Sequence, residues 1–448
     1  MMGFRTGFAA VVAISINFVA PANAETLADT LTYAYNNSGL LDQNRALLRA
    51  ADEDVAQAVA DTLPIVRWAA NASRNSVSDA TSATAAISAS YVFYDAGAGQ
   101  MSVEAKKELV LGTRQALIDI EQRVLLDAVA AYMDVLSDTE YLALRQSNVR
   151  VITQELRAAQ DRFDVGEVTR TDVALAEARL AAARSLLASA EGSLARSAEA
   201  YVEAVGRRPV SLQAVSAAPV SQSLAEAKAY AMRNHPRLRE AQHGVSAAEL
   251  AIRIGEAAMS PEAKLTGRAG IDQDGNIASE IGVEVGGVIY NGGKLSSGVR
   301  KLMASRDQTR AQLHLTAATI EQQVGSAYSF LEVARASIQA YNLQTKAARV
   351  AFDGVREEAT LGARTTIDVL NAEQELLTAQ ADLISARSEE VKASYQVLAT
   401  MGLLTAADLR LPVQQYDPAA YYNLVKDAPT ITSDQGQALD RVLKAIGQ

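Results

Sequence analysis

The sequence predicts a mixed α+β fold in which one unit, a β-hairpin carried on long helices, occurs twice. Residues 165–175 (VGEVTRTDVAL) and 361–371 (LGARTTIDVLN) share a Gly, a Thr and an Asp at the same places. An apolar period of seven residues follows each segment, as in a coiled coil. Each half also contains two runs in which apolar and polar residues alternate, which is the period of a β-strand. These observations predict an internal two-fold structural repeat.

The first residues of the chain have the character of a secretory signal peptide. Arg5 precedes an apolar run over residues 8–20, and residues 22–24 supply the small side chains that a signal peptidase requires. The run is too short for a permanent membrane span, although a buried N-terminal helix is an alternative. We therefore expect residues 1–24 to be removed and the mature chain, beginning at Glu25, to be exported.

Composition excludes several classes of site. The 448 residues carry a formal net charge of −10 and contain no cysteine, so disulfides, thiolate metal sites and a lipid anchor on an N-terminal cysteine are not expected. An acidic chain lacks the basic surface that nucleic acid requires. The histidines, His235, His243 and His314, are scattered, and we expect neither a metal site nor a cofactor.

Each half begins with a helical stretch that is kinked at the same point. The two stretches cover about 27–61 and about 224–257. Turn-forming residues interrupt them at 37–39 and 234–236, so each stretch is expected to form two helices in succession.

Pro64 and Pro261 end this helical period, and two alternating runs follow each of them. The apolar residues of the four runs are Val66, Trp68, Ala70 and Ala72; Ala85, Ile87, Ala89, Tyr91 and Phe93; Ala263, Leu265, Ala269 and Ile271; and Ile281, Val283, Val285 and Ile289. Polar loops over 76–82 and 272–279 join the runs in pairs. Each half is therefore expected to form one β-hairpin.

The four predicted strands suit a membrane barrel better than a soluble sheet. Each is close to the ~10 residues that cross a bilayer when tilted. A half-buried soluble hairpin would show the same alternation, but the chain is predicted to be exported, and aromatic residues such as Trp68, Tyr91 and Tyr290 stand near the strand ends. Because four strands cannot close a barrel around a lumen, several chains must contribute to one barrel.

Two very long helices follow the hairpins, over about 100–163 and about 294–358. At 1.5 Å per residue each would be roughly 95 to 100 Å long, so the helices are expected to pack side by side as a bundle or tube. A bend at Gly166 or Gly362 then leads into a return helix. The expected seam residues are Val173, Leu180, Leu187, Leu194 and Tyr201 with Ala176, Ala183 and Ala190, and Val369, Leu376 and Leu383 with Ala372, Ala379 and Ala386.

The Thr and Asp residues after each bend are placed to cap the return helix. Two prolines and little periodicity mark residues 208–222 as a linker between a first repeat over 25–207 and a second over 223–402. Residues 403–448 are expected to form an irregular C-terminal tail.

The duplicated unit resembles the TolC-type outer-membrane channel-tunnel family over about residues 25–410. The motifs that carry the resemblance are Arg-Phe-Asp-Val-Gly at 162–166, Thr-Asp at 171–172, Leu-Gly-Ala-Arg-Thr at 361–365, Asp-Val-Leu at 368–370 and Ile-Tyr-Asn-Gly-Gly at 289–293. The resemblance implies a mixed membrane α+β fold. In it, a homotrimer forms a 12-stranded β-barrel in the outer membrane, four strands from each chain, continued by a long periplasmic α-helical barrel that is closed at its far end.

The function that the resemblance implies is a passive exit duct for type I protein secretion, multidrug efflux or both. Its implied partners are a periplasmic adaptor protein, an inner-membrane ABC or RND transporter and the lipid of the outer membrane. No Walker-type nucleotide loop is present, so a partner would supply the energy.

Position by position, the resemblance implies a gate at the Gly bends. The implied periplasmic gate residues are Asp368, Asn371, Arg364, Thr171 and Asp172, and the implied adaptor-contacting tip residues are Val165, Gly166, Glu167, Leu361, Gly362 and Ala363. Asp368 resembles the residue whose ring narrows the entrance. Asp172 with Arg364 resembles a pair between helices that holds it shut. Helix capping is an alternative role for both aspartates.

The sequence departs from the family pattern at two gate positions. Asn371 stands where a second entrance aspartate is expected, and Ala359 stands where a tyrosine would bond to the Thr171–Asp172 segment. We therefore expect a gate that is less acidic and more loosely latched.

Two other classes of protein compete with this interpretation. A periplasmic coiled-coil adaptor would also be exported and helical, but it would carry one helical hairpin beside compact β-domains instead of two copies with membrane-length strands. An exported enzyme would need a convergent set of catalytic side chains, whereas the acidic residues here are spread along helix faces. We therefore expect no enzymatic activity.

Overall fold

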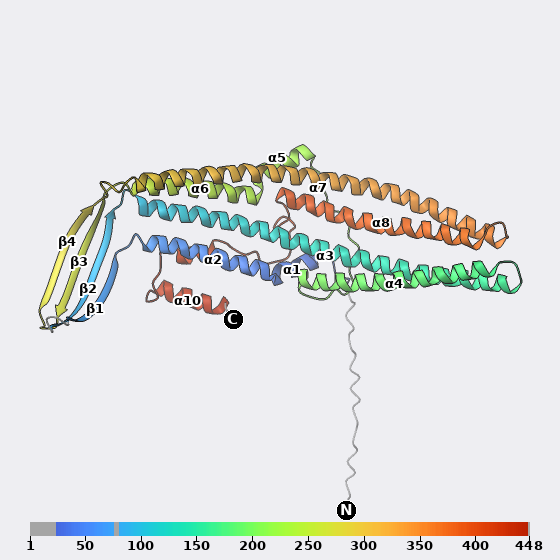
Figure 1. Cartoon of the computed structure of the whole chain (residues 1–448), viewed down its shortest axis with the longest axis horizontal. Coiled ribbons are helices and arrows are strands. Elements are labelled where there is room, and N and C mark those ends of the chain that lie inside the picture. Colours follow the sequence, from blue (N-terminus) through green and yellow to red (C-terminus); the bar gives the residue numbers. More distant parts are fainter. Residues whose placement is uncertain (1–23, 76–79, 447–448) are drawn as a thin grey trace, which may run out of the picture.

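The computed structural model describes residues 24–75 and 80–446 of the chain. The molecule is a long rod with a β-sheet at one end and two helical tips at the other (Figure 1). The expected signal peptide lies outside the described residues except for its last residue, and the loop expected over 76–82 is described only from residue 80.

The two halves contain the same elements in the same order. The first half has α1 (Leu27–Asn37), α2 (Gly39–Ala60), β1 (Ile65–Asn75), β2 (Ala80–Tyr94), α3 (Ala98–Asp164) and α4 (Arg170–Val205). The second half has α5 (Leu224–Asn234), α6 (Pro236–Ala257), β3 (Glu262–Asp272), β4 (Ile277–Gly286), α7 (Lys294–Thr360) and α8 (Thr366–Met401). Corresponding helices have equal lengths, of 11, 22, 67 and 36 residues. The duplication predicted from the sequence is therefore present in the structure.

The strands form one antiparallel sheet in the order β1-β2-β3-β4. Trp68 lies opposite Ile87, which lies opposite Ala269, so the apolar residues of the strands share one face. Arg268 lies opposite Glu280 on the other, polar face. The apolar face is open, with 81% of Trp68 exposed. In the described residues, β1 and β4 each pair with one neighbouring strand only, so the sheet has two open edges.

Two expected strand residues depart from the alternation. A register shift between Val92 and Tyr94 makes Phe93 the extra residue of a β-bulge, and Tyr94 pairs with Ala263 in its place. The last strand ends at Gly286, so Ile289 lies beyond it. The chain passes close to its neighbour there, because a Cβ atom on Gly287 would lie 3.2 Å from Cα of Pro261.

The 67-residue helices α3 and α7 run from the sheet to the tips, a length of about 100 Å. The shorter helices lie beside them and meet end to end. A Cβ atom on Gly402, which caps α8, would lie 3.1 Å from Cδ of Pro236 at the start of α6. Gly206 caps α4 with φ of 94° and abuts Asn37 at the end of α1. The rod is thus built as a lateral bundle, as its helix lengths predict.

The return helices bury part of the expected seam, and Val173, Leu187, Leu194, Ala372 and Leu383 are half-buried. Ala176, Leu180, Ala183, Ala190 and Tyr201 are buried in α4, and Val369, Leu376, Ala379 and Ala386 are buried in α8. The largest apolar cluster lies midway along the rod, where α1, α3, α4 and the segment after α8 meet. The alternation of large and small side chains lets these helices approach closely.

Glu25 organises a buried polar network beside this cluster. Its Oε1 accepts hydrogen bonds from the Tyr201 hydroxyl at 2.6 Å and from Arg207 Nη2 at 2.6 Å. Thr30 donates to the same oxygen at 2.9 Å. The backbone N–H of Glu25 donates to the carbonyl of Ser211 at 2.7 Å. The start of the described chain is thereby fastened to the end of α4 and to the segment that follows it.

The C-terminal tail is irregular over 403–419 and 426–433, as expected, but helical elsewhere in its described residues. It contains α9 (Ala420–Val425) and α10 (Asp434–Ile446). Leu439 of α10 packs in one cluster with Tyr421, Val425 and Ala56 of α2. Apolar residues hold the tail in place, because Leu404 and Leu411 join the large cluster midway along the rod and Leu439 joins the cluster with Ala56. Local sequence patterns do not specify these distant partners.

Replacement of Tyr201 by Phe removes one hydrogen bond to the buried Glu25 carboxylate. We expect a loss of about 1.5–3 kcal/mol in the free energy of unfolding, since hydrogen bonds to charged groups lie in that range. Denaturant unfolding followed by circular dichroism measures the change. Tyr290→Phe, at an exposed tyrosine, is the matched control and should change stability by less than about 0.5 kcal/mol. Equal effects of the two substitutions would contradict the role given to the network.

Candidate functional site at the helical tips

The two tips are tight turns between α3 and α4 and between α7 and α8. Gly166 and Gly362 adopt left-handed backbone angles, with φ of 82° and 76°. The next N–H group reaches back in each case, from Glu167 to the Arg162 carbonyl and from Ala363 to the Glu358 carbonyl, both at 2.9 Å. These hydrogen bonds end the long helices, and glycine is suited to the position because it has no Cβ atom.

A capping box then begins each return helix. The Thr169 hydroxyl and backbone N–H donate to Asp172 Oδ2 at 2.7 and 2.9 Å, and the Asp172 N–H donates to Thr169 Oγ1 at 3.4 Å. Thr365 and Asp368 repeat this arrangement at 2.7, 3.0 and 3.4 Å. Helix capping by these aspartates, predicted from the sequence as an alternative role, is therefore present at both tips.

The capping bonds also set the charge of the tips. Hydrogen bonds from the Thr365 hydroxyl and N–H hold the pKa of Asp368 below its ordinary value of 3.8, and those from Thr169 act in the same way on the pKa of Asp172. The stability that the ionised form contributes is present above pH 3.8 and is lost as the pH falls through the lowered pKa. Both tips consequently carry a carboxylate at neutral pH.

A groove of about 550 Å³ lies between the two tips. Glu167, Thr169 and Asp172 line it from the first tip, and Ala359 and Arg364 line it from the second. Of the five sequence-predicted gate residues, Asp172 and Arg364 line this groove, which lies at the end of the rod opposite the sheet (Figure 1).

Within one chain, Arg364 does not pair with Asp172, the partner that the family resemblance implies. Its Nε atom forms an ion pair with Glu358 Oε2 at 2.7 Å, on the other side of the same bend, whereas Asp172 is held by its own cap. Arg364 is exposed at the tip, where pairing with a carboxylate close by costs it little side-chain conformational entropy. Thr171 lies, exposed, in the first turn of α4.

Asn371 connects the two return helices. Its Oδ1 accepts a hydrogen bond at 3.3 Å from Nη2 of Arg179 on α4. The predicted tip residues are exposed, with 71% of Val165 and 78% of Leu361 accessible to solvent.

One buried contact near the tips was not predicted from the sequence. Asn148 of α3 donates from Nδ2 to Glu373 Oε1 of α8 at 2.8 Å. A signal was present, because Glu373 interrupts an apolar stripe between Leu370 and Leu377, all three of which are buried in α8. A charged residue in a buried stripe requires a polar partner on the facing helix.

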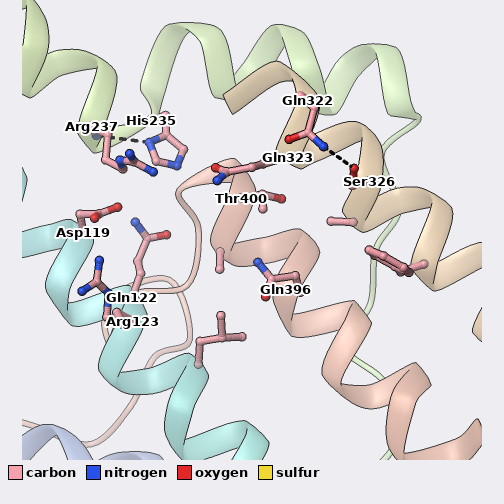
Figure 2. Close-up of a pocket in the computed structure, with 14 residues that line it drawn as sticks. Asp119, Gln122, Arg123, His235, Arg237, Gln322, Gln323, Ser326, Gln396 and Thr400 are labelled. Carbon is pink, nitrogen blue, oxygen red and sulfur yellow. Dashed lines mark hydrogen bonds between the residues drawn. The ribbon is translucent and has the colours of Figure 1, made fainter. Parts of the chain in front are cut away.

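A second cavity, of about 620 Å³, lies midway along the rod, where α6 and α8 meet end to end. Figure 2 shows polar side chains from four helices around it; those labelled are Asp119, Gln122, Arg123, His235, Arg237, Gln322, Gln323, Ser326, Gln396 and Thr400. The Nδ1 atom of His235 accepts a hydrogen bond from the Arg237 N–H at 3.2 Å, and burial lowers the pKa of His235 to about 4. His235 thus acts as the neutral N-cap of α6.

The described part of the chain holds no cluster of three or more His, Cys, Asp or Glu side chains arranged to bind a metal ion. Among its helices, none is both long enough and apolar enough to cross a bilayer.

Replacement of Thr365 by Ala removes the cap of α8. We expect a local loss of about 1 kcal/mol and faster amide hydrogen exchange in the first turn of α8, because orphan N–H groups lose their acceptor. Thr360→Ala is the control, since Thr360 bonds only to a carbonyl within its own helix, that of Glu357, at 2.7 Å. Exchange that is accelerated equally in both variants would contradict the capping role.

Comparisons with known proteins agree with the geometry. The sequence model of a family described as "Outer membrane efflux protein" matches residues 31–207 and 229–403. Outer membrane efflux protein BepC of Brucella suis biovar 1 is 38% identical over 418 residues, covering 91% of each chain. Alkaline protease secretion protein AprF of Pseudomonas aeruginosa is 25% identical over 322 residues, covering 67% of each.

Solved structures show the same fold. The CmeC outer membrane channel of Campylobacter jejuni superimposes with a TM-score of 0.78 at 15% identity, covering 91% of this chain and 90% of that one. Each matched segment of the family model includes one complete helix, hairpin and long-helix unit. The protein described here therefore belongs to the outer membrane efflux protein family.

Proposed function

We propose that three copies of this outer-membrane protein form a passive exit duct whose periplasmic entrance is the pair of helical tips in each copy. The observation that carries the proposal is the sheet: one face is apolar and exposed, and both edges lack a partner among the described residues of one chain. Three copies would supply 12 strands, enough to enclose a water-filled lumen.

One face of the sheet is suited to contact with lipid and the other to contact with water. Trp68, Ile281 and Val285 would face lipid, since 81%, 85% and 68% of these residues is exposed in one chain. The polar face would line the lumen, where Lys264 and Glu284 pair at 3.0 Å across β3 and β4. The roughly 100 Å helices then continue the lumen into the periplasm.

The tip carboxylates are proposed to form the constriction. Three copies of Asp368 around one axis would attract cations and repel anions, because like charges at close range are unfavourable unless they are screened. The remaining proposed gate residues are Asn371, Arg364, Thr171 and Asp172. In this proposal Asp172 and Arg364, which line the same groove, pair between helices when the entrance is shut, in place of the partners that each has in this structure.

The proposed partners follow from the exposed tips. Val165, Gly166 and Glu167 at one tip, with residues 361–363 at the other, would contact a periplasmic adaptor. An inner-membrane ABC or RND transporter would supply the energy. The relatives include both a protein named for efflux and one named for protease secretion, so both cargo classes remain within the proposal.

The proposed domain division follows the repeat. Residues 25–207 form the first repeat and 223–402 the second, joined by the linker 208–222. The extended backbone bridge between Glu25 and Leu212 supports this boundary, because it holds the linker against the body of the protein instead of leaving it as a free tether.

Conductance through planar bilayers tests the duct and its constriction. The mature protein should give discrete, cation-selective openings, and Asp368→Ala should lower the cation selectivity because the ring loses its charge. Asp353→Ala, which removes an exposed carboxylate from α7 above the tip, is the control and should leave selectivity unchanged. Absence of pores from a correctly folded protein would overturn the duct, and equal effects of both variants would overturn the constriction.

The two departures from the family pattern allow a second test. Asn371→Asp should increase cation selectivity, because it adds a carboxylate one turn above Asp368. Ala359 is only 4% exposed at the wall of the groove that Asp172 also lines. The ring of Ala359→Tyr would have to project into this groove, where its hydroxyl would bond to the Thr171–Asp172 segment, and it should reduce the fraction of time open. Single-channel recording measures both effects. Cation selectivity unchanged in Asn371→Asp, together with an open fraction unchanged in Ala359→Tyr, would show that these positions do not set the gate.

A further inference from the structure

The contact between Asn148 and Glu373 joins the two helical hairpins of one chain. Asn148 belongs to α3, in the hairpin of α3 and α4, and Glu373 belongs to α8, in the hairpin of α7 and α8. Both residues are 6% exposed, and their 2.8 Å hydrogen bond is buried. It lies in the second turn of α8, just above the tip.

Charged groups surround this contact on every packed helix. Glu155 of α3 and Arg356 of α7 act on Glu373 electrostatically and pair with each other at 3.3 Å. On α4, Arg179 is bonded to Asn371. On α3, one turn from Asn148, the buried Arg145 bonds to the Tyr141 hydroxyl and leaves its Nε and Nη1 atoms without a hydrogen-bond partner. The hydrogen bond that holds Glu373 itself comes from a neutral amide.

Burial of a carboxyl group beside a neutral donor favours its protonated form. Desolvation, reinforced by the charge of Glu155, raises the pKa of Glu373 to about 7, and the bond from Asn148 and the charge of Arg356 only partly oppose the rise. If the hairpins separated, water would reach the carboxyl group and its pKa would return towards the ordinary value of 4.5.

We propose that Asn148 and Glu373 form a buried clasp that holds the two hairpins of one chain together above the tip and must part when the entrance opens. The inference rests on the proposed function, because it takes the tips as the moving entrance. Glu373 is a positioning residue in this account: it does not line the constriction but determines how firmly the helices that carry Asp368 are held.

The direction of the pH dependence follows from proton binding. Between pH 4.5 and about 7 the clasped state binds more protons at Glu373 than the parted state does, so acid favours the clasped state. The preference is fully present below pH 4.5 and is lost as the pH rises through about 7. Glu373 of each chain can change the equilibrium between the clasped and parted states by at most about tenfold per pH unit.

Single-channel recording of the mature protein between pH 5 and 8 tests the clasp. The open fraction of the wild type should rise with pH. Glu373→Gln keeps an oxygen that accepts a hydrogen bond from Asn148, but its side chain cannot ionise. The open fraction of this variant should therefore stay at the low-pH value of the wild type at every pH. Asn148→Asp places a second carboxyl group opposite Glu373 and should raise the open fraction at pH 7 and above by repulsion.

Glu375→Gln is the matched control, since Glu375 is an exposed carboxylate two residues away on α8. It should retain the wild-type profile. A Glu373→Gln profile that follows the wild type, or a Glu375→Gln profile that is equally flat, would overturn the clasp.

Hydrogen exchange at the tips supplies a readout that needs no pore. After correction for intrinsic exchange, amides in the first turns of α8 should lose protection from pH 5 to 8 in the wild type but not in Glu373→Gln. If this difference in hydrogen exchange is found but the protein forms no pores, the duct is refuted and the clasp is retained. Pores without the difference in either assay would refute the clasp and keep the duct.

Discussion

The open edges of an amphipathic four-stranded sheet are the constraint on which the rest of the structure depends. Unpaired backbone N–H and C=O groups on β1 and β4 cannot be left in lipid, where no water can satisfy them, so the sheet has to be closed by other strands. A single chain has none to offer in its described residues. Closure by copies of the same chain puts the exposed Trp68 face outward and the charged face around a lumen. The long helices α3 and α7, which follow β2 and β4, must then also stand around the same axis, so that the helices of the copies form a tube.

The duplication explains how one chain builds both ends of this tube. Each repeat contributes two strands, a 67-residue helix and a capped tip, so adjacent tips present Asp172 and Asp368 in equivalent local settings. Equivalent sequence does not give equivalent surroundings, however. Glu177 occupies the place in α4 that Glu373 occupies in α8, yet Glu177 is exposed whereas Glu373 is buried against α3. The asymmetry arises because α3 packs against α8 as well as against α4, and it gives the second hairpin a buried carboxyl group that the first hairpin lacks.

Most of the fold could be predicted from the sequence because its determinants are local. The glycine bends, the capping Thr and Asp residues, the seam of α4 and α8 and the strand alternation are all set by residues within a few positions of one another. Features that depend on distant partners could not be predicted. The bulge at Phe93 depends on the register with β3. The partner of Arg364 depends on which carboxylate lies nearest at an exposed tip, the packing of α10 depends on a surface of α2, and the burial of Glu373 depends on which helix covers it.

Cross-linking of the sheet edges tests the central claim most directly, because the chain contains no cysteine of its own. One cysteine replaces Asn71 in β1, and a second replaces Ala278, Glu280 or Gly282 in β4, one at a time. After oxidation in outer membranes, the account predicts covalent monomers, dimers and trimers for at least one pair, with no larger species, because β1 of one copy pairs with β4 of the next in a closed ring of three. Monomers at every pair, or a ladder that continues beyond the trimer, would contradict it.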